Sequence, residues 1–235
     1  TGASTGIGAA TAKGFAANGA RVMVHYNASK AEAGAVVAEI IAAGGEAALV
    51  QGDISDRSVP ARIVADTVKH FGRIDVLINN AGGMLGRKWL GEMDDAHYDR
   101  VMDLNVWSVV AFMREVAPLM KAQGGGNIIN VSSIAARHGG GGGSVLYASA
   151  KGFISTFTKG MAKELIGANI RVNAVSPGYI DTAGLLAEYK RDMESKVPLG
   201  RIGTVAETVE AILFMARARY VTGEVLTVDG GLQLV

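Results

Sequence analysis

Hydrophobic and polar positions along the chain follow two alternating periods. Short apolar runs that are typical of buried strands cover residues 21–26, 47–51, 75–78, 127–131 and 220–228. Segments with helical spacing lie between them, at residues 9–18, 30–43, 59–71, 105–121, 147–166 and 205–216. Strands that alternate with helices are typical of parallel βαβ units. The pattern therefore predicts an α/β fold built on a parallel sheet.

Several polar motifs directly follow the expected strands. Asp53, Asn80-Ala81-Gly82 and Ser132-Ser133 each come at the end of one of these apolar runs. In open α/β sheets, ligands bind beyond the carboxyl ends of the strands. We therefore expect these motifs to share one crevice, together with the glycine-rich turn at the start of the chain.

That turn reads Thr1-Gly2-Ala3-Ser4-Thr5-Gly6-Ile7-Gly8 and leads into a helical segment. Glycines let a backbone turn tightly and approach a pyrophosphate, and a helix N-terminus offers unpaired N–H donors to the anion. The spacing Gly-x-x-x-Gly-x-Gly differs from the more common dinucleotide fingerprint Gly-x-Gly-x-x-Gly. The alternative is a flexible loop, because no strand precedes the turn in the sequence. A binding turn of this kind leads us to expect a buried first strand ahead of Thr1.

The pair Tyr147 and Lys151 is the strongest candidate for chemistry. On a helix, positions i and i+4 lie on one face, so the phenol and the ammonium can meet over one spot. A nearby cation favours the phenolate and lowers the tyrosine pKa from its usual value of about 10. A tyrosine tuned in this way can exchange a proton at neutral pH, as chemistry at a carbonyl carbon requires. Taken alone, such a pair is more often a solvated helix face.

Taken together, these motifs resemble the short-chain dehydrogenase/reductase family over nearly the whole chain. The matching residues, in the family's order, are Thr1-Gly2-x-x-x-Gly6-x-Gly8, Asn79-Asn80-Ala81-Gly82, Asn105, Ser132-Ser133, Tyr147-x-x-x-Lys151 and Pro177-Gly178. Within the family the chain is most similar to the 3-oxoacyl-(acyl carrier protein) reductase branch and to its sugar and alcohol dehydrogenase relatives. The resemblance implies a single Rossmann-like domain over residues 1–235, with a doubly wound parallel sheet and helices on both faces.

The resemblance also implies an NAD(P)-dependent oxidoreductase that interconverts a ketone and a secondary alcohol. Tyr147 would be the general acid/base, Lys151 would lower its pKa and bind the nicotinamide ribose, and Asn105 would position a water in a proton relay. Hydride would pass directly between nicotinamide C4 and the carbonyl carbon. The cofactor contacts expected from the turns are Gly2, Ser4, Thr5, Gly6, Ile7, Tyr26, Asn27, Ser29, Lys30, Asp53, Ile54, Asn80, Ala81, Gly82, Tyr147, Lys151, Pro177, Gly178, Ile180 and Thr182.

Two serines compete for the substrate oxygen. Ser133 aligns with the family's catalytic position, and alternation along a strand sends Ser132 to the opposite face. The segment between Ser133 and Tyr147 is about one residue longer than is usual in the family, and it contains five consecutive glycines, 139–143. Such a run is costly to order and is typical of a mobile loop tip. It could form an adaptable wall of the substrate pocket or be a tolerated surface expansion.

The residues after the expected strand 21–26 favour NADP over NAD. NAD-preferring enzymes place a carboxylate there to hold the ribose 2′-OH. In this chain the family's acidic position falls on Tyr26, and Asn27, Ser29 and Lys30 could meet a 2′-phosphate. Thr5 argues against this choice, because many NADP enzymes of the family carry Arg or Lys at that position. NADP(H) is therefore favoured and NAD(H) stays possible.

Composition sets limits on the other classes of function. With 235 residues, 49% of them hydrophobic, the chain fits one domain with a large core. A net charge of +1 favours neither nucleic acid nor an acidic membrane as a partner, and no apolar stretch reaches ~18 residues. The absence of cysteine excludes disulfides and permits a cytoplasmic location. No metal site is expected, because the four histidines are scattered: His25, His70, His97 and His138.

Three further expectations follow from the resemblance. Residues 183–196 would form a mobile lid over the substrate. Apolar helices at 105–121, 147–166 and 205–216, together with the strand at 220–228, would build a homotetramer, although they could also be purely core-facing. The substrate would be a small carbonyl compound or alcohol, either a 3-oxoacyl thioester or a sugar, polyol or other small alcohol. A non-catalytic cofactor-binding protein is a remote alternative, because it would be expected to lack the tyrosine, lysine or serine.

Overall fold

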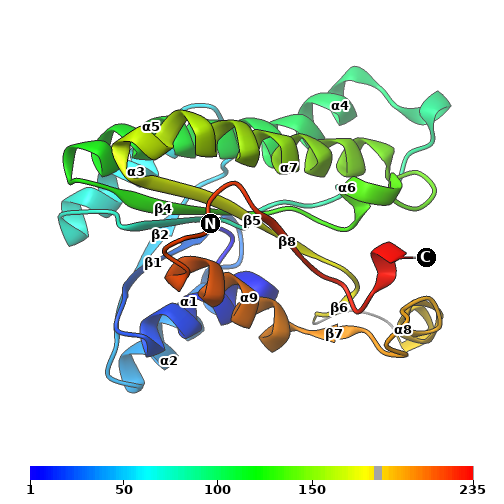
Figure 1. The fold of residues 1–235 in the computed structure, drawn as a ribbon, viewed down its shortest axis with the longest axis horizontal. Coiled ribbons are helices and arrows are strands. Elements are labelled where there is room, and N and C mark those ends of the chain that lie inside the picture. Colours follow the sequence, from blue (N-terminus) through cyan, green and yellow to red (C-terminus); the bar gives the residue numbers. More distant parts are fainter. Residues whose placement is uncertain (183–186, 235) are drawn as a thin grey trace.

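Strands and helices alternate along the chain largely as the sequence pattern predicts (Figure 1). The computed structural model describes residues 1–182 and 187–234. The strands are β1 (Arg21–Tyr26), β2 (Glu46–Gln51), β3 (Val76–Asn79), β4 (Gly126–Val131), β5 (Ile170–Pro177), β6 (Ile180–Asp181), β7 (Gly203–Thr204) and β8 (Val225–Val228). The helices are α1 (Gly6–Ala17), α2 (Lys30–Ala42), α3 (Val59–Phe71), α4 (Asp95–Met102), α5 (Ser108–Ala122), α6 (Ala135–His138), α7 (Val145–Leu165), α8 (Ala187–Glu194) and α9 (Val205–Arg217).

The sheet is parallel, which confirms the predicted fold class. Strand β1 pairs with β2, and the order in the second group is β3-β4-β5-β8. Figure 1 shows α5 and α7 above the sheet and α1, α2 and α9 below it. Because all these strands run the same way, their carboxyl ends lie along one edge.

A cavity of about 330 Å³ lies between β1 and β3, lined by residues of both strands. Residues 1–3 reach both strands near their carboxyl ends. The amino group of Thr1 donates to the Ile78 carbonyl at 2.8 Å, and the Ala3 N–H donates to the His25 carbonyl at 2.8 Å.

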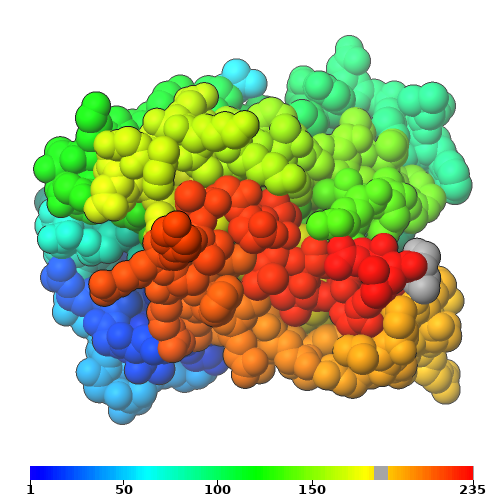
Figure 2. All heavy atoms as spheres, in the orientation of Figure 1, coloured from blue at the N-terminus to red at the C-terminus, as the bar shows by residue number. Residues whose placement is uncertain are grey.

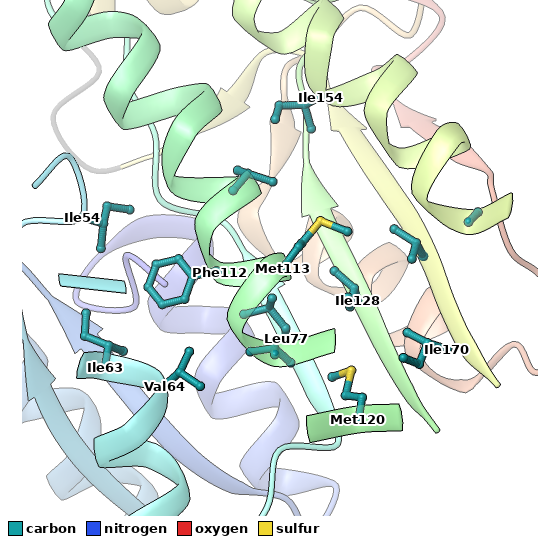
Figure 3. Close-up of a cluster of buried hydrophobic side chains, with 14 of the residues drawn as sticks. Ile54, Ile63, Val64, Leu77, Phe112, Met113, Met120, Ile128, Ile154 and Ile170 are labelled. Atoms are coloured by element: carbon teal, nitrogen blue, oxygen red, sulfur yellow. The ribbon is translucent and has the colours of Figure 1, made fainter. Parts of the chain in front are cut away.

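The largest apolar core lies between the sheet and the helices α3, α5 and α7 (Figure 3). Phe112, Met113 and Met120 of α5 pack there against Ile63 of α3 and Ile128 of β4. All five side chains are buried. Removing apolar surface of this size from water is the main driving force that holds the helices on the sheet.

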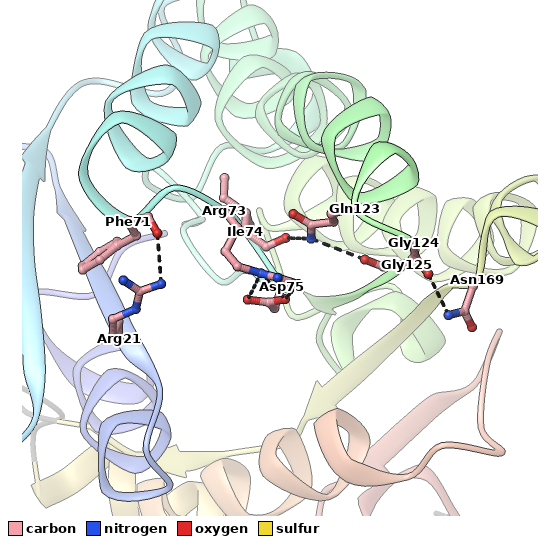
Figure 4. Close-up of polar contacts among 9 residues, drawn as sticks. All are labelled: Arg21, Phe71, Arg73, Ile74, Asp75, Gln123, Gly124, Gly125 and Asn169. Carbon is pink, nitrogen blue, oxygen red and sulfur yellow. Dashed lines mark hydrogen bonds and ion pairs between the residues drawn. The ribbon is translucent and has the colours of Figure 1, made fainter.

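Polar contacts join the turns at the amino ends of the strands, opposite the edge where the carboxyl ends lie (Figure 4). The Arg21 guanidinium donates to the Phe71 carbonyl at 2.9 Å, and the Gln123 amide donates to the Ile74 carbonyl. The Asn169 amide donates to the Gly124 carbonyl at 2.9 Å. These bonds connect the turns at the amino ends of the strands, on the side of the sheet away from the carboxyl ends.

Residues 105–121 are helical as predicted, although the first three belong to a π-helical turn, and the sequence analysis missed the helix α4 that precedes them. Helix α4 begins earlier, where the Asp94 carboxylate accepts the His97 N–H at 2.6 Å and so caps the helix. A π-helical turn, Asp103–Trp107, then joins α4 to α5. A capped helix of eight residues has too little apolar periodicity to stand out in the sequence.

The predicted strand at 220–228 is shorter in the structure, where β8 covers Val225–Val228. The residues before it are held by backbone bonds to β5, such as Gly223 N–H to the Val172 carbonyl at 2.8 Å, and also by side chains. The carbonyl of Val221 accepts from the Arg171 guanidinium at 3.1 Å and from the Asn173 amide at 2.9 Å. The expected lid at 183–196 lies partly outside the described residues, and its described part includes α8.

Candidate active site

A cavity of about 630 Å³ opens at the carboxyl ends of the strands. It is lined by residues that follow β1 to β5, so the motifs expected to share one crevice are brought together. The candidate residues that line it are Gly2, Ser4, Thr5, Ile7, Asn27, Ser29, Asp53, Ile54, Asn80, Ala81, Gly82, Ser133, Tyr147, Lys151, Pro177, Gly178, Ile180 and Thr182.

Four candidate residues do not line this cavity: Gly6, Tyr26, Lys30 and Asn105. The Tyr26 side chain is buried in an apolar cluster with Val24 and Val36. It therefore cannot take the place of a ribose-binding carboxylate, and the neighbouring Asn27 lies on the cavity wall in its stead. Lys30 is exposed at the start of α2.

The glycine-rich turn is an ordered structure rather than a flexible loop. Gly2 has φ +60° and Gly6 has φ +54°, a conformation that other residues rarely adopt. A Cβ on Gly8 would lie 2.0 Å from the Gly2 carbonyl oxygen. The Asn80 amide donates to the carbonyls of Thr1 and Gly2 at 3.0 and 3.1 Å, which fixes the turn against the end of β3.

Tyr147, Lys151 and Ser133 meet at one end of the cavity. Tyr147 and Lys151 lie one turn apart on α7, and the Lys151 ammonium lies 5.7 Å from the centre of the Tyr147 ring. Ser133 lines the same end of the cavity and lies close enough to Tyr147 to lower the pKa of its phenol. The Ser132 hydroxyl instead donates to the Lys151 carbonyl at 2.9 Å, within the packing of α7 against β4. Ser133 is therefore the serine available to a substrate oxygen.

Burial controls the ionisation of both α7 residues. It raises the pKa of Tyr147 above its usual value, and the neighbouring Ser133 hydroxyl offsets this only in part. The sequence predicts a lowered tyrosine pKa, whereas desolvation of the buried phenol places the pKa of Tyr147 above its usual value. Burial also lowers the pKa of Lys151 to about 8, and its ammonium donates to the Val131 carbonyl at 2.8 Å.

Asn105 lies within the π-helical turn Asp103–Trp107 and is fully buried. Its amide accepts from the Gly83 N–H at 3.0 Å and donates to the carbonyls of Gly83 and Val101, both at 2.9 Å. A Cβ on Gly82 would lie 2.8 Å from the Asn105 side-chain oxygen and 3.0 Å from the Lys151 ammonium. Asn105 and Lys151 thus flank Gly82, at the base of the catalytic end. A π turn of this kind often marks a functional site.

The run of glycines, residues 139–143, is held by a neighbouring segment. The Lys88 N–H donates to the Gly143 carbonyl at 2.8 Å, and the Arg87 guanidinium donates to the Gly142 carbonyl at 2.6 Å. A Cβ on Gly142 would lie 2.8 Å from the Trp89 ring. None of these residues lines the 630 Å³ cavity, so the structure favours a packed surface loop over a wall of that cavity.

Some residues of the cavity wall escape prediction from the sequence, among them His25, Leu104 and Val131. Leu104 and Val131 are apolar and carry no chemical signature, although each directly precedes a candidate motif. Within residues 1–182 and 187–234, no group of three His, Cys, Asp or Glu side chains could hold a metal ion. None of the helices in these same ranges has the length and apolar character needed to cross a membrane.

The pH dependence of the rate should report the buried lysine. We expect kcat to fall with the loss of one proton as the pH rises through about 8, because Lys151 loses its charge there. Tyr147 has a raised pKa and stays protonated in this range. Lys151→Arg should move this limb to higher pH, because a guanidinium keeps its proton. A kcat that stays flat from pH 7 to pH 10 in the unmodified protein would contradict this assignment.

The chain is similar to known proteins in its sequence and in its fold. A family model described as enoyl-(acyl carrier protein) reductase matches residues 2–233. A 3-oxoacyl-(acyl-carrier-protein) reductase of Synechocystis sp. is 41% identical over 235 residues, covering 99% of this chain and 94% of that protein.

Two solved structures extend the comparison to three dimensions. The first is an NADH-dependent reductase, A1-R′, responsible for alginate metabolism. It superposes with a TM-score of 0.91 at 38% identity, covering 98% of this chain and 94% of that one. The second is a 7α-hydroxysteroid dehydrogenase in complex with NADH and 7-oxo glycochenodeoxycholic acid. It superposes with a TM-score of 0.92 at 35% identity, covering 98% and 91%. The chain belongs to the short-chain dehydrogenase/reductase family of NAD(P)-dependent oxidoreductases.

Proposed function

We propose that the protein is an NADPH-dependent reductase that converts the ketone of a 3-oxoacyl thioester into a secondary alcohol. The observation that carries this proposal is the meeting of Ser133, Tyr147 and Lys151 at one end of a 630 Å³ cavity that the glycine turn also lines. The thioester class comes from the similarity to the Synechocystis 3-oxoacyl-(acyl-carrier-protein) reductase.

The cavity fits a nicotinamide dinucleotide. A Cβ on Gly8 would lie 2.0 Å from the Gly2 carbonyl oxygen. Because glycine has no side chain at this position, the backbone N–H groups of the turn can approach a diphosphate. Asp53 and Ile54 would hold the adenine end, Asn80 to Gly82 the middle, and Ile180 and Thr182 the carboxamide of the nicotinamide. When bound, the nicotinamide supplies or accepts the hydride.

The side chains at the catalytic end supply the proton and the orientation. Ser133 donates a hydrogen bond to the substrate carbonyl oxygen, and Tyr147 gives that oxygen its proton. The raised pKa of Tyr147 keeps the phenol protonated at neutral pH, as reduction requires. Lys151 holds a buried positive charge beside the phenol and stabilises the tyrosinate that forms. Asn105 holds Gly83, and with it the backbone next to Lys151.

The preference for NADPH is supported by the residues at the end of β1. Asn27 and Ser29 line the cavity there and can donate hydrogen bonds to a 2′-phosphate, and neither brings a negative charge. Thr5 lines the same cavity and supplies no positive charge. The alginate-related reductase is described as NADH-dependent, and the 7α-hydroxysteroid dehydrogenase is in complex with NADH. The choice between NADPH and NADH therefore needs its own test.

Asn27→Asp provides that test. The new carboxylate should repel a 2′-phosphate and accept hydrogen bonds from a ribose 2′-OH. We expect the ratio of kcat/KM for NADPH to that for NADH to fall about tenfold or more. Asn27→Ser is the matched control, because it keeps a neutral polar group. An unchanged ratio in the aspartate variant would show that Asn27 does not lie beside the ribose.

The alginate-related reductase favours a second candidate, an NAD(P)-dependent dehydrogenase of sugar-derived or other small alcohols. The two functions can be separated by comparing kcat/KM for acetoacetyl coenzyme A with kcat/KM for a panel of keto-sugar acids and polyols. The proposal predicts a clear NADPH-linked rate with the thioester. A rate confined to the sugar-derived compounds would replace the thioester proposal with the second candidate.

We further propose a homotetramer that works in the cytoplasm. Exposed apolar side chains lie on two helices, Phe153 on α7 and Phe214 on α9. Helix α9 and the segment after it form the middle of the face seen in Figure 2, between α7 and the α1–α2 pair. Large exposed apolar groups are typical of interfaces between proteins. Sedimentation equilibrium at micromolar concentration should give four times the mass of the chain, and the mass of one chain would refute the tetramer.

A further inference from the structure

His25 is a buried histidine that takes no part in the proton transfer proposed for Ser133, Tyr147 and Lys151. It is the fifth residue of β1, and its side chain is 4% exposed. It lines the cavity proposed to hold the cofactor. A buried polar ring needs hydrogen-bond partners, because an unsatisfied polar group in the interior is costly. The partners of this ring show what it does.

Both ring nitrogens of His25 bond to the backbone, and they do so on two different segments. The Gly2 N–H donates to Nδ1 at 2.9 Å, and Nε2 lies 2.9 Å from the Gly52 carbonyl oxygen. Because a backbone N–H can only donate, Nδ1 has no proton, so Nε2 carries the hydrogen and donates it to Gly52. His25 is therefore a neutral imidazole in one defined tautomer. Burial lowers its pKa to about 4, which agrees with a neutral ring.

The two bonded segments belong to neighbouring parts of the proposed cofactor site, the diphosphate turn and the adenine side. Gly2 is the first glycine of the phosphate-binding turn, and Asn80 holds its carbonyl from the other side at 3.1 Å. Gly52 directly precedes Asp53, on the adenine side, and its N–H donates to the Tyr26 carbonyl at 3.0 Å. The imidazole is the side chain that joins the turn to this corner.

We propose that His25 is a positioning residue for the cofactor: its imidazole sets the distance between the glycine turn and the Gly52–Asp53 corner. The inference rests on the proposed cofactor site. His25 acts through the backbone of residues that would contact the dinucleotide. Its loss should therefore weaken cofactor binding and leave proton transfer at Tyr147 unchanged.

Two substitutions of His25 and one control test this role. His25→Leu removes both bonds and leaves the Gly2 N–H without a partner, so the dissociation constants of NADPH and NADH should rise about tenfold or more. His25→Gln retains one donor and one acceptor, so its affinity should lie between those of the leucine variant and the unmodified protein. His70→Gln, at an exposed position on α3, is the matched control and should bind both cofactors normally. With saturating cofactor, kcat of the His25 variants should stay within about twofold of the original.

Nitrogen NMR of the imidazoles in the unmodified protein tests the geometry without any variant. The His25 ring should show a protonated Nε2 and an unprotonated Nδ1 at neutral pH. This measurement, with His25→Gln, carries the test if His25→Leu does not fold. Wild-type cofactor affinity in His25→Leu, or a His25 ring that is charged or protonated at Nδ1, would overturn the inference alone. An unmodified protein that binds neither cofactor would overturn the proposed function, and the positioning role with it.

Discussion

Replacing Tyr147 with phenylalanine is expected to lower kcat by about 10² to 10⁴-fold, because it removes the general acid and keeps the shape of the side chain. The phenol is the group that meets the Ser133 hydroxyl, and its raised pKa makes it a proton donor at neutral pH. The ring would still pack beside Lys151, so the dissociation constant of NADPH should change little. Pre-steady-state and steady-state rates with a 3-oxoacyl thioester, together with a cofactor titration, measure both quantities.

Tyr179→Phe is the matched control for this substitution. It removes the same hydroxyl group from a tyrosine that lies beyond β5 and does not line the cavity. Its kcat should stay near that of the unmodified protein. Near-normal turnover in Tyr147→Phe would remove Tyr147 from the mechanism. Equal losses in both variants would point to a general effect of losing a hydroxyl rather than to catalysis.

Substituting Gly8 with alanine is expected to abolish tight cofactor binding. The new Cβ would lie 2.0 Å from the Gly2 carbonyl oxygen and 2.5 Å from the Asn80 amide, so the turn must open. Because this contact is with backbone, the neighbour cannot rotate away. We expect the dissociation constant of NADPH to rise about 100-fold or more, since the phosphate-binding N–H groups leave their positions. The free energy of unfolding should fall by about 2 kcal/mol or more.

Gly34→Ala is the control, because the same substitution should raise the free energy of unfolding there instead of lowering it. Gly34 lies in α2, and a Cβ at that position would meet nothing within 4 Å. Alanine in an open helix position stabilises the fold by about 0.5–1 kcal/mol relative to glycine. Cofactor affinity should be unchanged in this variant. Normal NADPH binding by Gly8→Ala would show that the turn does not hold the diphosphate.

Much of the fold can be predicted from the sequence where local signals agree with one another. Helix α3 has the predicted bounds, because its apolar face is strongly periodic and Gly72, with φ +82°, ends it. The motifs after β2, β3 and β4 meet as expected, because parallel strands bring their carboxyl ends to one edge. The bounds of α3 depend on a short segment of sequence, and the meeting of the motifs depends on the parallel direction of the strands.

The features that could not be predicted depend on contacts between distant segments. The role of His25 requires knowing that Gly2 and Gly52 lie on either side of its ring, which no spacing in the sequence reveals. The raised pKa of Tyr147 depends on the depth of burial and not on its distance from Lys151 along α7. The side chain of Tyr26 turns toward the α2 side of β1, so a count along the family's pattern assigns it a contact that the packing does not allow.

The same limit applies to the glycine run at 139–143. Composition alone predicts a mobile loop tip, because glycine has the largest backbone entropy to lose. The structure holds the run with backbone and side-chain bonds from Arg87 and Lys88, residues more than fifty positions earlier in the chain. Trp89 approaches Gly142 so closely that a larger residue would not fit there without movement.

The most direct test of the account follows one hydrogen from cofactor to product. The protein would be incubated with acetoacetyl coenzyme A and NADPH that carries deuterium at both C4 positions of the nicotinamide. The account predicts 3-hydroxybutyryl coenzyme A with one deuterium, bound to the carbinol carbon, and mass spectrometry of the product measures it. Oxidation of NADPH without deuterium on that carbon, or no conversion by protein that binds NADPH, would contradict the proposed reduction of a 3-oxoacyl thioester.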